Sequence, residues 1–235
     1  EEGPEARRVL ERSAFLSPFG PDGDLPVHIM VCAKVVPATS VTIQIDPVTK
    51  RMARKDVTQE LDPQAACAVE EGLRLMEKHG GSVVVVTMGR EDAGVGIRSA
   101  LAMGATSAIH LSDEALAGSD ALGTAKALAA AIRKEPFDLV LCATESSDSY
   151  TGIVPGQVAQ LLGIPALTFA KEMAVDGKKI TIKRQSEHGY DVVESLLPAL
   201  WRSRTARRRE AELAERAHGI ARRLRLDHVL DNPVT

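Results

Sequence analysis

Short apolar runs alternate with longer helical segments through the first two thirds of the chain. The apolar runs, each as long as a typical buried strand, span residues 27–33, 82–88, 107–111 and 138–143. Segments with the composition or spacing of helices span residues 62–79, 91–102, 120–133 and 154–162. Because strands and helices alternate, we expect right-handed crossovers and an α/β fold, a doubly wound, mostly parallel sheet of Rossmann-like architecture covered on both faces.

The pattern changes after residue 165, where apolar and polar residues alternate. Three such stretches span residues 167–175, 178–184 and 190–196, and a turn at Asp176-Gly177 separates the first two. They predict an added antiparallel strand region. A short peripheral hairpin is expected from residues 41–46 and 51–54. Residues 197–200 have the composition of one more core strand, and residues 201–225 favour a basic helix.

The two ends of the chain differ from its middle in their basic residues. Every lysine lies between Lys34 and Lys183, and arginine is the only permanent base of both flanks. We therefore expect a disordered extension or short helix over residues 1–26, an α/β domain over 27–200 and an Arg-rich helical tail over 201–235. The acidic start is unlike a mitochondrial transit peptide, and no apolar signal core is evident.

Composition restricts the kinds of partner that we expect. The net charge of −3 gives no sign of a nucleic-acid partner, and no apolar run approaches the roughly 18 residues of a membrane span. Cys32, Cys67 and Cys142 lie far apart in apolar runs. They indicate buried thiols in a reducing compartment and give no spacing typical of a metal site or a disulfide framework.

The loop at residues 144–152 is the strongest candidate for a binding site. It joins a buried strand to a helix, so free backbone N–H groups and the positive end of the helix point above the strand tip, where phosphate commonly binds. The loop supplies hydroxyl groups and glycines at Ser146, Ser147, Ser149, Thr151, Gly152 and, just beyond it, Gly156. An ordinary strand-to-helix connection stays open, since neither a Walker A nor a G-x-G-x-x-G spacing is present.

The predicted sheet gives this loop its neighbours. Ligands of doubly wound sheets bind at the carboxyl edge, where the strand order reverses. The tips of the first, second and fourth strands, at residues 32–34, 87–89 and 143–149, should therefore line the site. This placement favours a nucleotide ligand.

Several motifs in the same order resemble one known family. They are Lys34-Val35-Val36-Pro37, Leu61-Asp62-Pro63 with residues 68–72, residues 97–105, Thr144-Glu145-Ser146-Ser147-Asp148, Thr151-Gly152, Gly156-Gln157, residues 161–165 and Leu197-Pro198-Ala199. With these motifs, residues 27–199 resemble the β subunit of electron-transfer flavoproteins, including the nitrogen-fixation-associated members. The resemblance implies an adenine nucleotide alpha hydrolase-like fold for the nucleotide-binding domain at residues 27–200.

The resemblance also implies a function. A β subunit of this family pairs with an α subunit as a heterodimer and shares its FAD. It binds AMP itself, or a second FAD in bifurcating members. The pair carries electrons from flavin dehydrogenases to a quinone oxidoreductase or another acceptor, so we expect an electron carrier in the bacterial cytoplasm and not an enzyme in its own right.

The resemblance carries a set of nucleotide-binding residues onto this chain. Matched position by position, they are Cys32, Asp62, Pro63, Gln64, Ala65, Met88, Ser147, Asp148, Ser149, Thr151, Gly152, Val154, Gly156 and Gln157. The phosphate is expected on the loop and helix start between Ser147 and Gln157, bound mostly by backbone N–H groups. Plain core packing is the alternative for Cys32 and Met88, and a helix cap is the alternative for Asp62.

The chain departs from the family in two places. Ala38 stands where many members have Asp, and the segment that members use to dock redox partners is missing after Ala199. A frame change or a diverged end near residue 200 would explain the second departure, and a genuine amphipathic helix that binds a partner is the alternative.

Two other classes of protein compete with this interpretation. One is a stand-alone adenine-nucleotide sensor of the universal-stress type, whose glycine signature is not evident near the last parallel helix. The other is an ATP pyrophosphatase-type ligase, whose Ser-Gly-Gly phosphate loop would follow the first strand, where Lys34-Val35-Val36-Pro37 stands instead.

Overall fold

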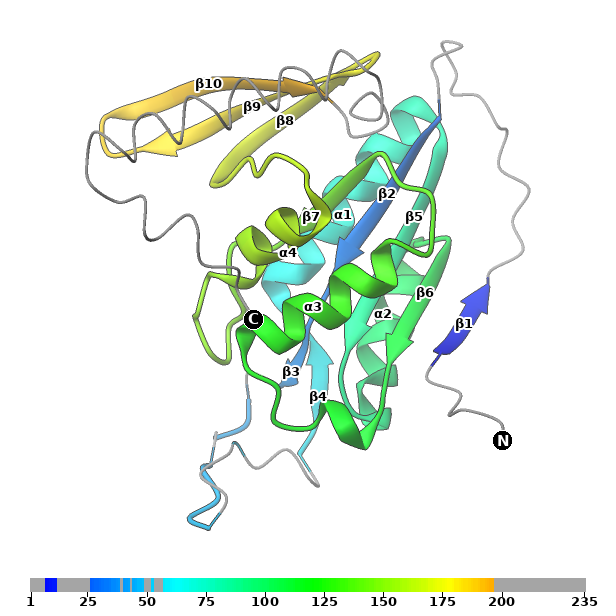
Figure 1. Ribbon diagram of the computed structural model, residues 1–235, viewed down its shortest axis with the longest axis vertical. Helices are drawn as coiled ribbons and strands as arrows, with labels where there is room; N and C mark the ends of the chain where they lie inside the picture. Colours follow the sequence, from blue (N-terminus) through cyan, green and yellow to red (C-terminus); the bar gives the residue numbers. More distant parts are fainter. Residues whose placement is uncertain are drawn as a thin grey trace.

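The computed structural model describes residues 7–11, 26–38, 40–42, 44–48, 52 and 57–196. Its main sheet has the strand order β1-β6-β5-β2-β7 (Figure 1). The strands are β1 (Arg7–Glu11), β2 (Val27–Cys32), β5 (Gly81–Met88), β6 (Ser107–Leu111) and β7 (Leu139–Cys142). The last four run parallel to their neighbours, and β1 pairs antiparallel with β6 at the edge.

Two pairs of helices cover the two faces of this sheet (Figure 1). They are α1 (Pro63–His79) with α2 (Gly94–Met103), and α3 (Ala121–Ile132) with α4 (Val154–Leu162). Alternate residues of each buried strand serve different faces: Ile29 and Val31 of β2 pack with α1 and α2, whereas Met30 packs with α3 and α4. The predicted doubly wound, mostly parallel α/β fold is confirmed.

The order of the parallel strands reverses at β2. From β2 the chain moves to its neighbour β5 and then to β6, and it returns to place β7 on the other side of β2. The crevice outside the carboxyl ends of β2 and β7 is therefore the topological switch point, where ligands of such sheets bind.

A separate antiparallel sheet follows α4, as the alternating pattern predicts. Its strands β8 (Ala170–Asp176), β9 (Lys179–Ser186) and β10 (Gly189–Leu196) pair in the order β10-β9-β8. Ile180 and Ile182 of β9 are buried with α1 and the main core. The opposite side of β10 exposes Tyr190, Val192 and Leu196.

Short elements complete the described chain. They are the small antiparallel pair β3 (Val35–Pro37) and β4 (Gln59–Leu61), and the 3-10 turns η1 (Glu91–Ala93) and η2 (Glu114–Leu116). A bridge between Ile45 and Met52 stands where the peripheral hairpin was predicted. Within the described residues, no helix is both long enough and apolar enough to span a membrane.

The N-terminal extension differs from what the sequence predicts. Residues 1–26 were expected to be disordered or to form a short helix, but Arg7–Glu11 form strand β1 against β6. Edge pairing of this kind uses backbone hydrogen bonds, which leave little trace in the side-chain pattern. The rest of that extension, the expected core strand at 197–200, the Arg-rich tail at 201–235 and its proposed frame change lie outside the described residues.

Candidate functional site

A cavity of about 470 Å³ opens at the switch point of the main sheet. Its wall is built from the carboxyl ends of β2, β5 and β7, the start of α1, the start of α3, and the loop that leads into α4. Its size falls within the range of small-molecule sites, about 300 to 1,000 Å³. The cavity therefore lies where the sheet topology predicts a ligand.

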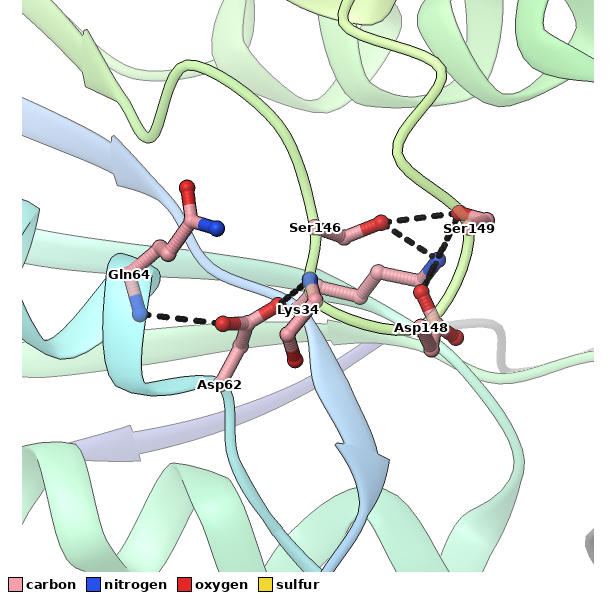
Figure 2. Close-up of polar contacts among 7 residues, drawn as sticks. Lys34, Asp62, Gln64, Ser146, Asp148 and Ser149 are labelled. Atoms are coloured by element: carbon pink, nitrogen blue, oxygen red, sulfur yellow. Dashed lines mark hydrogen bonds and ion pairs between the residues drawn. The ribbon is translucent and has the colours of Figure 1, made fainter. Parts of the chain in front are cut away.

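Asp62 ties two parts of this wall together. Its side chain is 1% exposed and caps helix α1, because Oδ1 accepts a hydrogen bond from the Gln64 backbone N–H at 2.9 Å. Its other oxygen, Oδ2, accepts a hydrogen bond from the Ser147 backbone N–H at 2.8 Å (Figure 2). One carboxylate thus positions both the helix start and the loop after β7.

Lys34 makes a second connection between the same loop and the tip of β2. Its Nζ donates to Ser146 Oγ at 3.0 Å, to Asp148 Oδ1 at 2.5 Å and to Ser149 Oγ at 3.0 Å (Figure 2). The Asp148 side chain is 1% exposed and the Lys34 side chain 39%. The two serine hydroxyls are 2.8 Å apart and complete the network. These contacts with Lys34, which follows β2, therefore hold the loop in shape.

The end of the loop turns sharply into α4. Tyr150 and Gly152 both have positive φ, 48° and 63°. The N-cap residue of α4, Ile153, makes no side-chain capping bond, so the first N–H groups of the helix, which have no partner within it, lie at the loop end. A Cβ at Gly152 would meet no atom closer than 3.8 Å. Backbone conformation explains this glycine, and packing does not.

The structure brings eight of the predicted site residues to the cavity wall. These are Cys32, Asp62, Ala65, Met88, Ser149, Thr151, Gly152 and Val154. They come from four separate stretches of sequence, which the fold assembles at one sheet edge.

The other six predicted residues do not line the cavity. Pro63 is the first residue of α1, and Gln64 and Ser147 offer only their N–H groups to Asp62 in the contacts described. Asp148 belongs to the loop, and its carboxylate accepts a hydrogen bond from Lys34 Nζ. Gly156 and Gln157 lie on α4; Gln157 Oε1 is buried and has no hydrogen-bond partner in the described part of the chain.

Sequence reasoning missed one wall of the cavity. Helix α3 and the turn before it contribute Ser119, Asp120, Ala121, Thr124 and Leu128, and Pro155 of α4 also lines the cavity. The lining residues Ala33, Lys34, Ala143, Glu145 and Ser146 belong to the strand tips that were expected to line the site. Asp120 caps α3, accepting from the Gly123 N–H at 2.7 Å. The helix start is readable from sequence, but its place at this cavity follows only from the topology.

The charges on the wall determine how an anion could bind. Among the lining residues Lys34 is basic, whereas Asp62, Asp120 and Glu145 are acidic. An anionic group would therefore depend on backbone N–H groups at the start of α4, because the three N–H donors of Lys34 already contact the loop. The acidic side chains could instead accept hydrogen bonds from hydroxyl groups of a ligand.

Two cysteines form part of the cavity floor. Cys32 of β2 and Cys142 of β7 are partners in the strand register. The pKa of the Cys32 thiol is raised well above its ordinary value, first by a hydrogen bond with Cys142 and then by burial. Cys67 lies apart from them and is exposed on α1, whereas Cys32 and Cys142 are half-buried, which corrects the expectation that all three thiols are buried. The described residues include no group of three or more His, Cys, Asp or Glu side chains arranged for a metal ion.

Comparison with known proteins matches most of the chain to one family. Residues 49–219 match the family model described as "Electron transfer flavoprotein domain". The chain is 41% identical over 174 residues to "Electron transfer flavoprotein subunit beta" of Thermoanaerobacterium thermosaccharolyticum, covering 74% of this chain and 66% of that protein.

Two further relatives carry more specific names. The chain is 41% identical over 176 residues to "Caffeyl-CoA reductase-Etf complex subunit CarD" of Acetobacterium woodii, covering 74% of this chain and 67% of that subunit. It is 40% identical over 182 residues to "Protein FixA" of Azorhizobium caulinodans, covering 74% of this chain and 64% of that protein. The matched chain thus spans about two thirds of the length of these relatives.

Proposed function

Since the chain belongs to the electron transfer flavoprotein β-subunit family, we propose that it pairs with an α subunit and carries electrons. In this proposal the heterodimer accepts electrons from flavin dehydrogenases and passes them to a quinone oxidoreductase or another acceptor. The pair shares an FAD held mainly by the α subunit, and that flavin supplies the redox chemistry. The chain itself acts as a carrier subunit, not as an enzyme, in the bacterial cytoplasm.

The cavity at the switch point is the observation that carries this proposal. We propose that it holds AMP, with a second FAD as the alternative. The cavity is large enough for the nucleoside of AMP, and Ala65, Met88 and Leu128 are among its apolar lining residues. Thr151 and Gly152 of the loop and Val154 at the start of α4 also line the cavity, and this segment offers N–H donors to a phosphate group.

Each side of the cavity has a separate task in this arrangement. Asp120, the N-cap of α3, and Thr124 of α3 line the cavity, and their side-chain oxygens suit the ribose hydroxyl groups. Asp62 and Lys34 act less directly, because their hydrogen bonds set the shape of the phosphate loop. The chain thereby binds and orients the nucleotide, which in turn joins β2, β7, α3 and α4 into one unit.

Co-expression with an α subunit from the same source tests the carrier function. The purified pair should be yellow, with the absorption bands of bound flavin, and a flavin dehydrogenase with its substrate should bleach those bands. The chain expressed alone should be colourless. A pair that fails to assemble, or that binds flavin which no dehydrogenase reduces, would reject the proposal. The family match disfavours a stand-alone nucleotide sensor, and such a sensor would form homodimers that bind ATP without flavin.

A further inference from the structure

The antiparallel sheet of β8, β9 and β10 has an inner face and an outer face. Val175, Ile180 and Ile182 are buried on the inner face, against the main core. Because side chains alternate along a strand, the register places the other set on the outer face, which on β10 consists of Tyr190, Val192, Glu194 and Leu196. Within the described part of the chain, more than half of the Tyr190 and Val192 side chains stays open to solvent.

The rest of the outer face is charged. Lys179 and Glu194 form an ion pair at 2.9 Å, and Lys183 and Glu172 form another at 2.6 Å. Asp176, the register partner of Lys179, adds a third carboxylate to these two lysines. The outer face therefore favours a partner that has an apolar surface flanked by basic side chains.

The chain runs from this face directly into its Arg-rich end. Strand β10 ends at Leu196, and residues 201–225 contain nine arginines against three glutamates. At about 100° per residue, five apolar residues of this segment fall on one side of a helix. They form an apolar stripe and are Ala206, Leu213, Ala217, Ile220 and Leu224. The segment thus has the apolar surface and the basic charge that suit the outer face.

The stripe and the strand also match in length. A helix rises about 27 Å between residues 206 and 224, and the eight residues of β10 span about 24 Å. The nine residues between Leu196 and Ala206 can reach as far as about 30 Å. This connection is long enough for a helix to turn back along β10.

We propose that residues 201–225 form an amphipathic helix that folds back over the outer face of β10 when the chain has no partner. The stripe covers the apolar side chains of that face, and the arginines lie near its carboxylates. Because the helix belongs to the same chain, its effective concentration at the face is on the order of 1 mM, so a weak contact is enough. The cover also removes an exposed apolar surface that would otherwise favour association.

The helix competes with any protein that binds the outer face. This part of the inference rests on the proposed function, in which an α subunit pairs with the chain. An α subunit that binds the outer face has to displace the helix first, so the covered state lowers its apparent affinity. The helix then acts as an autoinhibitory cover, which protects the apolar side chains until the α subunit is present.

Limited trypsin digestion of the full chain tests the contact, because the nine arginines are cleavage sites within the segment. Leu213→Glu places a charge in the stripe and should make cleavage between residues 202 and 225 about 10-fold faster, since cleavage follows the open population. Val192→Asp, on the sheet, should have the same effect. Ala211→Glu, on the opposite side of the helix, and Val48→Asp, at an exposed residue away from this sheet, are the matched controls and should be cleaved like the unchanged chain.

The cleavage rates within the segment, measured by mass spectrometry, decide the proposal. Equal rates in all variants and the unchanged chain would overturn it. Protection that appears only at high protein concentration would also overturn it, because the occupant of the face would then be a second copy of the chain.

Calorimetry with the purified α subunit tests the competition separately. Leu213→Glu should bind the α subunit about 3- to 10-fold more tightly than Ala211→Glu does. Equal affinities would refute the competition. Failure of the α subunit to bind either variant would contradict the proposed function, whereas the digestion result would still decide whether the helix covers the sheet.

Discussion

Oδ2 of Asp62 accepts a hydrogen bond from the backbone N–H of Ser147, with 2.8 Å between oxygen and nitrogen, although the two residues are 85 positions apart in the sequence. Asp62 also caps α1 with its other oxygen, so its two oxygens have different partners, both of which donate. This bond is the direct link between the start of α1 and the proposed phosphate loop. The shape of the loop should therefore depend on Asp62 having two acceptor oxygens.

Asp62→Asn should destabilise the protein and loosen the loop. The amide can still cap α1 with its oxygen, but its NH₂ group then faces the Ser147 N–H, and a buried donor loses its acceptor. We expect the free energy of unfolding, measured by urea titration, to fall by about 1–3 kcal/mol. Asp113→Asn is the matched control, since Asp113 Oδ1 accepts a hydrogen bond from the Ala115 N–H at an exposed turn, and an amide oxygen can replace it. This variant should change the free energy of unfolding by less than about 0.5 kcal/mol. Equal effects of the two variants would contradict this role.

The Lys34–Asp148 ion pair should show strong coupling in a double-mutant cycle. Lys34→Met removes an ammonium group that lies 2.5 Å from the carboxylate of Asp148, a side chain that is 1% exposed. We expect the free energy of unfolding to fall by about 2 kcal/mol. Adding Asp148→Asn should restore part of that loss, with a coupling energy of about 1–2 kcal/mol. The exposed pair Lys179–Glu194, with side chains 46% and 55% exposed, is the comparison. Its coupling energy should be about 0.5 kcal/mol or less. A Lys34–Asp148 coupling as small as this would refute a structural role in the loop.

Alkylation should distinguish Cys32 from Cys67. The raised pKa of Cys32 leaves little thiolate near neutral pH, and only the thiolate reacts. Iodoacetamide at pH 7.5 should modify exposed Cys67 much faster than Cys32, and the difference in rate should narrow as pH rises. Peptide mass spectrometry at timed intervals measures both rates. Cys32 reacting at pH 7.5 as fast as Cys67 would show that its thiol is not held in the protonated form.

The same pKa shift has a consequence for stability. The unfolded chain loses its Cys32 proton from about pH 8.5, whereas the folded chain keeps it to higher pH. The contribution of this group is therefore complete below about pH 8.5 and is lost as pH rises through the raised pKa of the folded state. The unfolding free energy of Cys32→Ser should decline less between pH 8 and 10 than that of the unchanged chain. An equal decline of the unfolding free energy in the variant and the unchanged chain would contradict the raised pKa of Cys32.

Gly152 and Gly163 allow the binding role of the loop to be separated from backbone strain. Both have positive φ, 63° and 70°, and a Cβ at either would meet no close atom. Alanine at each should therefore cost a similar amount of stability, about 1 kcal/mol. Only Gly152 lines the cavity, while Gly163 ends α4, so only Gly152→Ala should lose bound nucleotide. Equal nucleotide content in the two variants would contradict a phosphate site at Gly152.

The outer side of β10 is the apolar surface that we expect to meet the α subunit. Tyr190, Val192 and Leu196 are 59%, 67% and 44% exposed on one face of this strand, which also carries Glu194, and exposed apolar side chains rimmed by polar residues are typical of a protein interface. Val192→Asp should weaken the heterodimer by about 10-fold or more, measured by calorimetry with the purified α subunit. Val48→Asp, at a residue 86% exposed away from this sheet, should have no effect. Unchanged affinity for Val192→Asp would place the interface elsewhere.

Local signals were enough to predict most elements of the main domain. Helix α4 spans the predicted residues 154–162 because Pro155 suits its first turn and Gly163 adopts the left-handed conformation that ends it. The predicted cap at Asp62 is also confirmed, because its side chain accepts from the Gln64 N–H and Pro63 suits the first turn of α1. The pairs β1–β6 and β3–β4 were missed because their backbone hydrogen bonds give a short strand no clear side-chain pattern.

The site required information that periodicity does not contain. The loop after β7 could be chosen from its small polar residues, but the α3 wall with Asp120 could not, since helical spacing does not show which strand end a helix start will face. The pairing of Cys32 with Cys142 likewise follows only from the register of β2 and β7. Strand order, and not any local motif, brings these residues to one cavity.

Identification of the bound nucleotide tests the central claim most directly. The chain is purified alone and as a complex with its α subunit, each preparation is denatured, and the released small molecules are identified and counted by mass spectrometry. We predict one AMP per chain in both preparations and one FAD per complex; a second FAD in place of AMP would assign the bifurcating alternative to the same cavity. Release of ATP without flavin from either preparation, or of no adenine nucleotide at all, would contradict the account.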